Sequence, residues 1–276
     1  MSAALARLER KLAVRLLDRT TRRLSATAEG AEFYARCKQI TADLEEAELT
    51  VGRVGRVPSG RLRVGMPSAL GRMWIVPRLA DFAHAYPTVS LEVVFSDFVP
   101  STIGEGLDLS IQVGELHPSS LTVRKLAAVR YVVCASPGYL ARGAPQKPAD
   151  LVHHACLAYR RPRNGRLREW KFSDGHTMHA AKSTDAMTFN SGEALVAAAA
   201  AGLGITQVAE YYAHPLLETG ELVEILADYK TEGHDISMLY PQQKPIAPKL
   251  RVFTEFMLGL FDPPPWTAQR RRAPAG

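Results

Sequence analysis

Residues 2–24 read Ser-Ala-Ala-Leu-Ala-Arg-Leu-Glu-Arg-Lys-Leu-Ala-Val-Arg-Leu-Leu-Asp-Arg-Thr-Thr-Arg-Arg-Leu, and this stretch gives the first indication of the fold. It holds seven basic residues against only Glu9 and Asp18, whereas the whole chain of 276 residues has a formal net charge of +6. So concentrated a basic patch is typical of a protein that contacts a phosphate backbone, although a solvated amphipathic helix carries similar charge. Leucines recur at spacings of three and four, which predicts a helix with one buried stripe and then a short basic loop over 19–23. These leucines are Leu5, Leu8, Leu12 and Leu16.

The composition indicates a folded protein in a reducing compartment. With 46% hydrophobic residues, the chain can bury one large core or two modest ones. No apolar run is long enough to cross a bilayer, and the charged N-terminal residues are unlike a secretory signal. Cys37, Cys134 and Cys156 form no CxxC pair, which argues against a disulfide scaffold or a cysteine zinc site. We therefore expect a cytoplasmic protein with no membrane partner.

A heptad pattern follows the basic stretch. Thr27 is a favourable N-cap, and small or apolar residues then recur at alternating spacings of four and three. They are Phe33, Cys37, Ile40, Leu44, Ala47, Val51 and Val54. A stripe with a period of about 3.5 residues is typical of a helix that pairs with another helix. We expect a linker and dimerisation helix over 27–57, although a surface helix packed on its own domain shows a similar stripe.

From residue 61 onward, strand and helix patterns alternate, which predicts an α/β fold with parallel strands and helices on the sheet faces. The expected strands cover 61–66, 89–95, 107–113, 132–135, 156–159, 169–172, 178–182, 186–189, 204–208, 222–226 and 236–240. The expected helices cover 71–86, 101–105, 151–154, 191–202, 210–217 and 248–261. The order predicts two lobes, the first about 61–133 with 236–262 and the second about 134–235. Residues 263–276, rich in Pro and Arg, are expected to be disordered.

The stretch Leu8-Glu-Arg-Lys-Leu-Ala-Val-Arg-Leu-Leu-Asp-Arg-Thr-Thr-Arg-Arg-Leu-Ser-Ala-Thr-Ala-Glu-Gly30 closely resembles part of the DNA-binding module of LysR-type transcriptional regulators. The resemblance continues in Gly60-Arg-Leu-Arg-Val, Tyr86-Pro-Thr-Val-Ser-Leu-Glu, Glu105-Gly-Leu-Asp-Leu-Ser-Ile, Cys134-Ala-Ser-Pro-Gly-Tyr-Leu and Gly202-Leu-Gly-Ile. It implies a winged helix-turn-helix remnant over 1–26, the linker helix, and an effector domain over 61–262. Such effector domains resemble periplasmic solute-binding proteins and hold a small ligand between their lobes.

The resemblance implies DNA contacts within the first stretch. Its recognition helix would include Ser2, with Arg7 and Arg10 further along near phosphates. Its wing would comprise Arg19, Thr20, Thr21, Arg22 and Arg23. In the family, two further helices and a turn precede this point. We therefore expect weak, nonspecific and steeply salt-dependent DNA binding from a chain that begins at Met1, or else a start codon assigned too far downstream.

Two segments suit a small anionic effector such as a carboxylate. Pro67-Ser-Ala-Leu-Gly71 and Asn190-Ser-Gly192 each lie between a predicted strand and a helix N-terminus, where backbone N–H groups attract negative charge. Ligands of open α/β sheets bind at the carboxyl ends of strands. The same side chains could instead be simple N-caps. With the matching family positions, the expected effector-binding residues are Ser68, Ala69, Leu70, Gly71, Val113, Gly114, Ser136, Asn190, Ser191 and Thr206.

The sequence departs from the family pattern at two places and gives little sign of other chemistry. Val208-Ala209 stands where the family often has Leu-Pro, and Val99-Pro100 where an acid commonly follows the valine. The HxxH pair of His176 and His179 has no carboxylate in a known ligand pattern, and Cys134 lies in an apolar strand that favours an inert thiol. Phosphate-loop, serine-hydrolase and dinucleotide motifs are absent. We expect no cofactor, no metal and no enzymatic activity, and we interpret the basic loop over 160–168 as solvated surface.

These features predict a DNA-binding transcription regulator that is controlled by a small effector and forms a homodimer or homotetramer. The alternative is an effector-binding module without specific DNA binding, which would act by forming mixed oligomers with a full-length relative. The two functions differ in whether the purified chain retards operator DNA.

Overall fold

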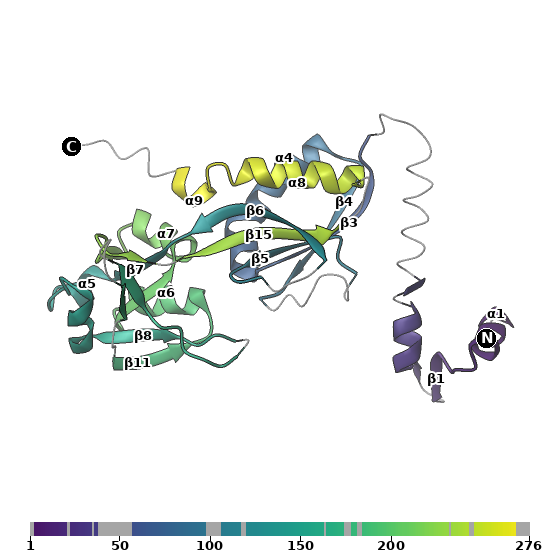
Figure 1. Ribbon diagram of the computed structural model, residues 1–276, viewed down its shortest axis with the longest axis horizontal. Helices are drawn as coiled ribbons and strands as arrows, with labels where there is room; N and C mark the ends of the chain where they lie inside the picture. The colour runs from purple at the N-terminus through teal and green to yellow at the C-terminus, as the bar shows by residue number, and fades with distance from the viewer. Residues whose placement is uncertain are drawn as a thin grey trace. The chain divides into compact units, whose positions relative to one another are not determined.

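A computed structural model describes residues 3–20, 23–34, 36–37, 57–97, 106–116, 120–162, 164–173, 178–180, 184–231, 233–242 and 246–268. The chain forms two compact units, Met1–Val57 and Pro58–Gly276 (Figure 1). Of the expected elements, the helix over 101–105 lies outside the described residues. In the described part of the chain, no helix has the length and apolar character needed to cross a membrane.

Unit 1 begins with helix α1 (Ala3–Leu12), followed by the antiparallel hairpin of β1 (Leu17–Thr20) and β2 (Arg23–Ala26). The helix ends four residues before the predicted last leucine, because Ala13 turns the chain with a φ of 54°. Leu16 is nevertheless only 6% exposed, so it is buried although it lies beyond the end of the helix. Arg19, Thr20 and Arg23, which were expected in a loop, belong to the strands of the hairpin. Residues 28–34 and 36–37 are helical, as the heptad pattern predicts.

Short-range hydrogen bonds fix the hairpin between the two helical segments of unit 1. The carboxylate of Glu9 accepts hydrogen bonds from the backbone N–H groups of Leu16, at 2.9 Å, and Leu17, at 3.3 Å. Thr27 is the N-cap of the second helical segment, since its Oγ1 accepts from the N–H of Gly30 at 2.9 Å. The same hydroxyl donates to the carbonyl oxygen of Arg15 at 2.7 Å. A single threonine therefore joins the turn after α1 to the start of the next helix.

Lobe I of unit 2 is built on a five-stranded sheet in the order β4-β3-β5-β15-β6. Its strands are β3 (Gly60–Met66), β4 (Val89–Phe95), β5 (Leu109–Val113), β6 (Leu121–Val129) and β15 (His234–Pro241). β3 pairs in parallel with β4 and β5, as expected, but β15 pairs antiparallel with β5 and β6. The prediction of purely parallel pairing was wrong, because the returning strand and β6 do not follow crossover helices. The expected strands did not include β6.

Helices cover the lobe I sheet. The predicted helix over 71–86 is a continuous path of α3 (Ser68–Leu70), a π turn (Gly71–Ile75), a 3-10 turn (Val76–Arg78) and α4 (Leu79–Ala85). Helix α8 (Pro248–Leu260) lies beside α4 (Figure 1), and the rings of Phe82 and Phe253 meet edge to face at 5.2 Å between centroids. The expectation of disorder from Pro263 onward was wrong for helix α9 (Pro265–Ala268), because Trp266 is buried at 1% exposure.

Lobe II has a second five-stranded sheet in the order β11-β8-β12-β7-β13. Its strands are β7 (Tyr131–Ala135), β8 (Ala155–Tyr159), β11 (Thr184–Phe189), β12 (Ile205–Ala209) and β13 (Val223–Ile225). Its main helices are α5 (Pro137–Leu140), a 3-10 segment (Pro148–His153), α6 (Gly192–Ala200) and α7 (Glu210–Glu218). A small sheet of β9 (Lys171–Ser173), β10 (Met178–Ala180) and β14 (Lys230–Thr231) completes the lobe. One face of the large sheet packs on α6 and α7 through Leu195 and Val208.

The chain crosses between the lobes at two adjacent places. One crossing is Arg130, between β6 and β7, and the other is the link between β14 and β15 around Gly233. Because β8, β11 and β12 run in parallel, their carboxyl ends meet at one edge of lobe II, beside Tyr131. The carboxyl ends of β3, β4 and β5 likewise share one edge of lobe I. We call these two edges the interlobe edges.

Candidate effector cleft and nucleic-acid interface

Both segments that were expected to bind an effector lie at the interlobe edges. Ser68 follows β3 in lobe I, and Asn190 follows β11 in lobe II. The elements that begin there also connect the lobes. Arg72 forms an ion pair with Glu193 in the first turn of α6. The indole nitrogen of Trp74 donates to the carbonyl oxygen of Tyr211 in α7 at 3.0 Å.

The backbone groups of these segments are less free than the sequence predicted. The N–H of Ser68 donates to the carboxylate of Asp97, which follows β4, at 2.9 Å. The Oγ of Ser191 accepts from the N–H of Ala194 at 3.3 Å, as an ordinary N-cap of α6 does. One amide of each helix start is therefore already satisfied inside the protein. At the lobe I edge the partner is itself an anion, which weakens the attraction of that helix start for a ligand carboxylate.

Burial separates the expected effector residues into two groups. Ala69, Leu70 and Gly71 are buried in lobe I, so they offer no exposed side chain at the interlobe edge. Ser68 is half-buried and Asn190 is exposed, and both keep polar atoms at the edge. Val113 and Gly114 end β5 at the same edge of lobe I, and the N–H of Gly114 donates to the carbonyl oxygen of Asp235 at 3.0 Å.

Two expected residues lie away from the interlobe edges. Ser136 follows β7 at the opposite end of the lobe II sheet, because β7 runs antiparallel to β12. It is 6% exposed, and its Oγ caps α5 by accepting from the N–H of Tyr139 at 3.3 Å. Thr206 lies inside β12 and is fully buried, with no hydrogen-bond partner for its hydroxyl among the described residues. Ser68, Gly114, Asn190 and Ser191 therefore lie at the interlobe edges, whereas Ser136 and Thr206 do not.

Tyrosine side chains lie at this edge of lobe II. They were not among the predicted site residues. The ring of Tyr212 packs so closely on the start of α6 that a Cβ added to Gly192 would lie 2.6 Å from it. Burial raises the pKa of Tyr212 to about 12, and the negative charges of Asp97 and Glu193 act in the same direction. The phenol therefore stays protonated at neutral pH and can donate a hydrogen bond.

Arg168 lies at the same edge with its guanidinium between two aromatic rings. Its Cζ is 4.0 Å from the ring centroid of Tyr131 and 5.5 Å from that of Tyr159. Its Nη2 donates to the backbone carbonyl of Gln207. The prediction that the basic loop over 160–168 is solvated surface was wrong for Arg168, which is half-buried. Arg160 and Leu167 form an antiparallel bridge, and this hairpin folds Arg168 back onto the sheet edge.

His234, the first residue of β15, is affected by the positive charges at this edge. Burial lowers its pKa below the ordinary value of 6.5, and the positive charges of Arg161 and Arg168 lower it further. Its ring meets that of Tyr131 edge to face at 5.7 Å between centroids. Burial likewise raises the pKa of Tyr159, against the opposing effect of Arg168. The lobe II edge thus combines positive charge with protonated phenols.

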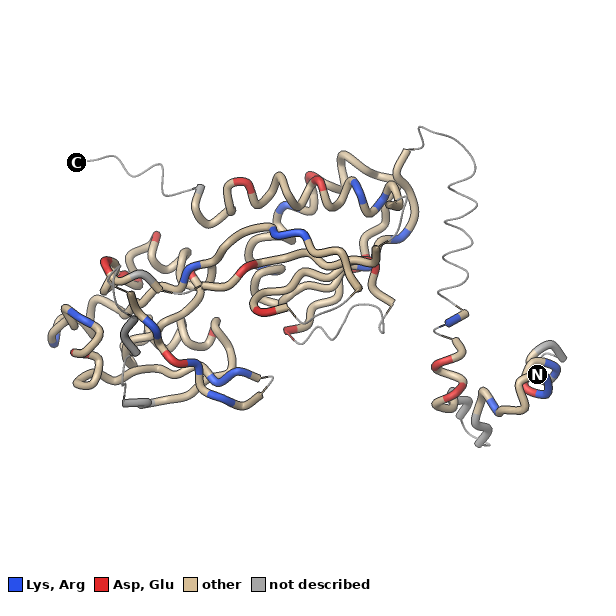
Figure 2. Tube along the Cα trace, in the orientation of Figure 1, with Lys and Arg blue, Asp and Glu red and all other residues tan. Residues whose placement is uncertain are grey.

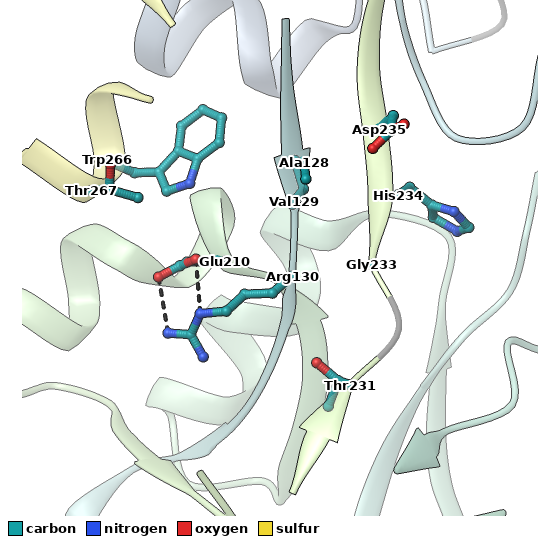
Figure 3. A pocket seen from close by; sticks show the side chains of 10 residues that line it. All are labelled: Ala128, Val129, Arg130, Glu210, Thr231, Gly233, His234, Asp235, Trp266 and Thr267. Atoms are coloured by element: carbon teal, nitrogen blue, oxygen red, sulfur yellow. Dashed lines mark hydrogen bonds and ion pairs between the residues drawn. The ribbon is translucent and has the colours of Figure 1, made fainter. Parts of the chain in front are cut away.

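A separate hollow of about 470 Å³ lies at the two crossings between the lobes (Figure 3). Arg130, Thr231 and His234 contribute to its lining, together with Trp266 of α9. Arg130 already donates to Glu210 and to Glu224. Its charge is therefore satisfied within the protein, and we interpret the hollow as part of the hinge.

The residues that were expected to contact nucleic acid belong to unit 1. Lys and Arg are concentrated in α1 (Figure 2), where Arg7 and Arg10 are exposed. Arg19, Thr20 and Arg23 belong to the β1–β2 hairpin. Ser2, Thr21 and Arg22 lie outside the described residues. A basic helix beside a two-stranded wing offers a surface that suits phosphate groups.

The dimerisation stripe is described only at its beginning. Phe33 and Cys37 are half-buried, while most of their described neighbours on the helix are exposed. Ile40, Leu44, Ala47 and Val51 lie outside the described residues.

In lobe II, burial raises the pKa of the Cys134 thiol to about 12, in agreement with an inert cysteine. No group of three or more His, Cys, Asp or Glu residues in the described ranges is placed to hold a metal ion.

Known proteins share both units. Residues 55–262 match the LysR substrate binding domain, and residues 1–31 match the bacterial regulatory helix-turn-helix protein of the lysR family. An HTH-type transcriptional regulator of Xanthomonas campestris is 35% identical over 254 residues, which cover 91% of this chain and 74% of that protein. The regulator CrgA of Neisseria meningitidis is 33% identical over 260 residues, covering 94% of this chain and 86% of that protein.

Structural comparison agrees with the sequence comparison. The structure of CrgA, a LysR-type transcriptional regulator from Neisseria meningitidis, has a TM-score of 0.66 to this chain at 33% identity. The alignment covers 92% of this chain and 86% of that structure. The two-lobed α/β effector domain is thereby confirmed, together with the match of the N-terminal residues to a helix-turn-helix domain, and the family is one of regulators rather than enzymes. The chain belongs to the LysR-type transcriptional regulators.

Proposed function

We propose that unit 2 binds a small carboxylate between its lobes and that this binding controls the occupancy of DNA by unit 1. The effector would lie at the interlobe edges, with Ser68 on one side and Asn190 on the other. Protein side chains at the carboxyl ends of strands from two lobes form a site that can close on a small ligand.

The observation that supports the proposal is that contacts join the two lobes close to both predicted segments. Arg72 in lobe I reaches Glu193 in α6, and Trp74 reaches the carbonyl of Tyr211 in α7. These contacts connect the segment that follows Ser68 to the first turns of α6 and α7. A ligand between them would change the interlobe contacts directly, because those contacts arise from the same short segments. Such a coupling gives the differential contacts that a regulatory equilibrium requires.

A thermal-shift screen of small carboxylates on the purified chain tests the effector site. We expect at least one carboxylate to raise the unfolding temperature by mass action, and Ser68→Ala and Asn190→Ala to reduce that shift. Ser90→Ala is the matched control, since Ser90 is exposed at the other end of the lobe I sheet. An equal shift in the wild type and in both site variants would contradict the site.

For unit 1 we propose phosphate contacts from Arg7, Arg10, Arg19, Arg22 and Arg23, with Thr20 and Thr21 in the wing and Ser2 in the recognition helix. The support is the exposed basic face of α1 and the short hairpin that follows it. Contacts of this kind position a protein on DNA without reading its sequence. For the helix over 27–57 we propose self-association along the stripe that begins at Phe33. Sedimentation of the purified chain, with Phe33→Asp as the disrupting variant, tests that assignment.

A further inference from the structure

We propose that Arg168 is the residue of the interlobe site that recognises the carboxylate of the effector. This inference rests on the proposed function and names the group that fixes the ligand class. Arg168 comes from lobe II, so the ligand charge would be held by the lobe opposite Ser68. The effector would then bridge an arginine on one lobe and a hydroxyl on the other.

The first observation is that three arginines in lobe I and at the crossing between the lobes pair with carboxylates. Arg63 pairs with Glu92 at 2.9 Å, Arg72 pairs with Glu193, and Arg130 pairs with two glutamates. Arg168 is half-buried as well, yet the described residues give it no carboxylate partner. Its Nε is buried and has no hydrogen-bond partner in the described part of the chain. A guanidinium that is partly removed from water normally has an anion beside it, and the carboxylate of a ligand could supply that anion here.

The second observation is that the guanidinium is held in one orientation. Tyr131 stacks under it at 4.0 Å, and the carbonyl of Gln207 accepts from its Nη2. The backbone N–H of Arg168 donates to the carbonyl of Tyr159 at 2.8 Å, which fixes the start of the side chain. A planar, pre-oriented guanidinium matches the two oxygens of a carboxylate and loses little freedom on binding.

The third observation is the distribution of charge across the two interlobe edges. On lobe I the carboxylate of Asp97 occupies the N–H of Ser68, so that edge is already supplied with negative charge. On lobe II, Arg168 is joined by Tyr159 and Tyr212, whose phenols can donate hydrogen bonds. The carboxylate end of a ligand is therefore favoured on lobe II, and its neutral end on lobe I.

Isothermal titration of the full chain with benzoate and pyruvate, beside the neutral isostere benzamide, tests this assignment. We expect a carboxylate to bind the wild-type chain and Arg168→Gln to weaken that binding by about tenfold or more, since a charged hydrogen-bond pair is lost. Arg168→Lys keeps the charge without the planar fork and should give an intermediate affinity. Benzamide should bind wild type and Arg168→Gln equally weakly.

Arg166→Gln is the matched control, because Arg166 lies in the same hairpin and is exposed. Thermal unfolding of each variant separates lost binding from lost folding. If Ser68→Ala abolishes carboxylate binding while Arg168→Gln and wild type bind equally, the role of Arg168 is wrong and the interlobe site stands. If neither carboxylate binds the wild-type chain, both the ligand class and the role of Arg168 are overturned.

Discussion

Arg130 and Glu210 form a two-point ion pair at the crossing between the lobes. The Nε and Nη2 of Arg130 donate to the two carboxylate oxygens of Glu210 at 3.0 and 2.9 Å (Figure 3). The N–H of Glu210 also donates to the carbonyl oxygen of Arg130 at 3.0 Å. Burial opposes the charge of Arg130, but its hydrogen bonds to Glu224 and Glu210 prevail and raise its pKa above the ordinary value. The crossing strand is thus fastened to the first residue of α7.

Replacing Arg130 by Ala should destabilise unit 2. Glu210 is only 5% exposed, so the variant would leave a buried carboxylate without its partner. We expect the free energy of unfolding to decrease by about 2 kcal/mol. This loss is smaller than that for a fully buried ion pair, because Arg130 is 38% exposed. Urea unfolding measures it. Arg124→Ala, at an exposed position of β6, is the control, and equal midpoints for the two variants would contradict the role of the pair.

Local patterns predicted most elements because they decide local structure. The buried alternation of β3 and the N-cap at Thr27 depend on neighbouring residues, and both are present. The end of α1 was missed because the positive φ of Ala13 and the burial of Leu16 depend on the hairpin. β6 was missed because exposed charged residues such as Arg124 and Lys125 interrupt its apolar alternation.

The candidate site was less predictable than the fold. Ser68 and Asn190 could be placed at strand ends from sequence order alone. Arg168 could not, because its position depends on a hairpin and on the ring of Tyr131, which comes from a distant strand. Ser136 was misplaced because the antiparallel direction of β7 is set by tertiary pairing rather than by its own residues.

Gly30→Ala should disrupt unit 1 and leave unit 2 intact. A Cβ at this position would lie 1.9 Å from the carbonyl oxygen of Leu16, so the helix must move away from the hairpin. We expect faster proteolytic cleavage within unit 1 at an unchanged cleavage rate in unit 2, measured by limited proteolysis and mass spectrometry. Gly259→Ala is the same substitution with nothing within 4 Å of the added atom. Equal cleavage patterns for the two variants would show that the contact is dispensable.

Arg7→Gln should reduce the salt dependence of DNA binding. Arg7 is exposed on α1, where it can neutralise one phosphate. Each such contact contributes about −0.9 to the slope of log affinity against log salt, so the slope should become shallower by about one. Fluorescence anisotropy with a labelled duplex over a salt series measures this slope. Arg124→Gln removes the same charge from unit 2, and a slope change of equal size in that variant would refute a specific contact from α1.

His234 should make the stability of unit 2 depend on pH near neutrality. Its pKa is lowered in the folded protein by burial and by Arg161 and Arg168, while Glu115 and Asp235 oppose the shift. As pH falls below the ordinary value of 6.5, the unfolded chain therefore binds a proton before the folded chain does. The free energy of unfolding should decrease through that range and level off below the folded pKa.

His234→Gln should remove this decrease, because glutamine does not titrate. Urea midpoints measured from pH 8 down to pH 5 compare the variant with the wild type at each pH, with the window set around the ordinary histidine value. His84→Gln, at an exposed position of α4, should keep the wild-type dependence. A carboxylate bound beside Arg168 would offset the positive charge that lowers the pKa of His234. Saturating carboxylate should stabilise both proteins by mass action, but it should make the loss of stability at low pH smaller only in the wild type. An equal, pH-independent gain in both proteins would separate His234 from the ligand site.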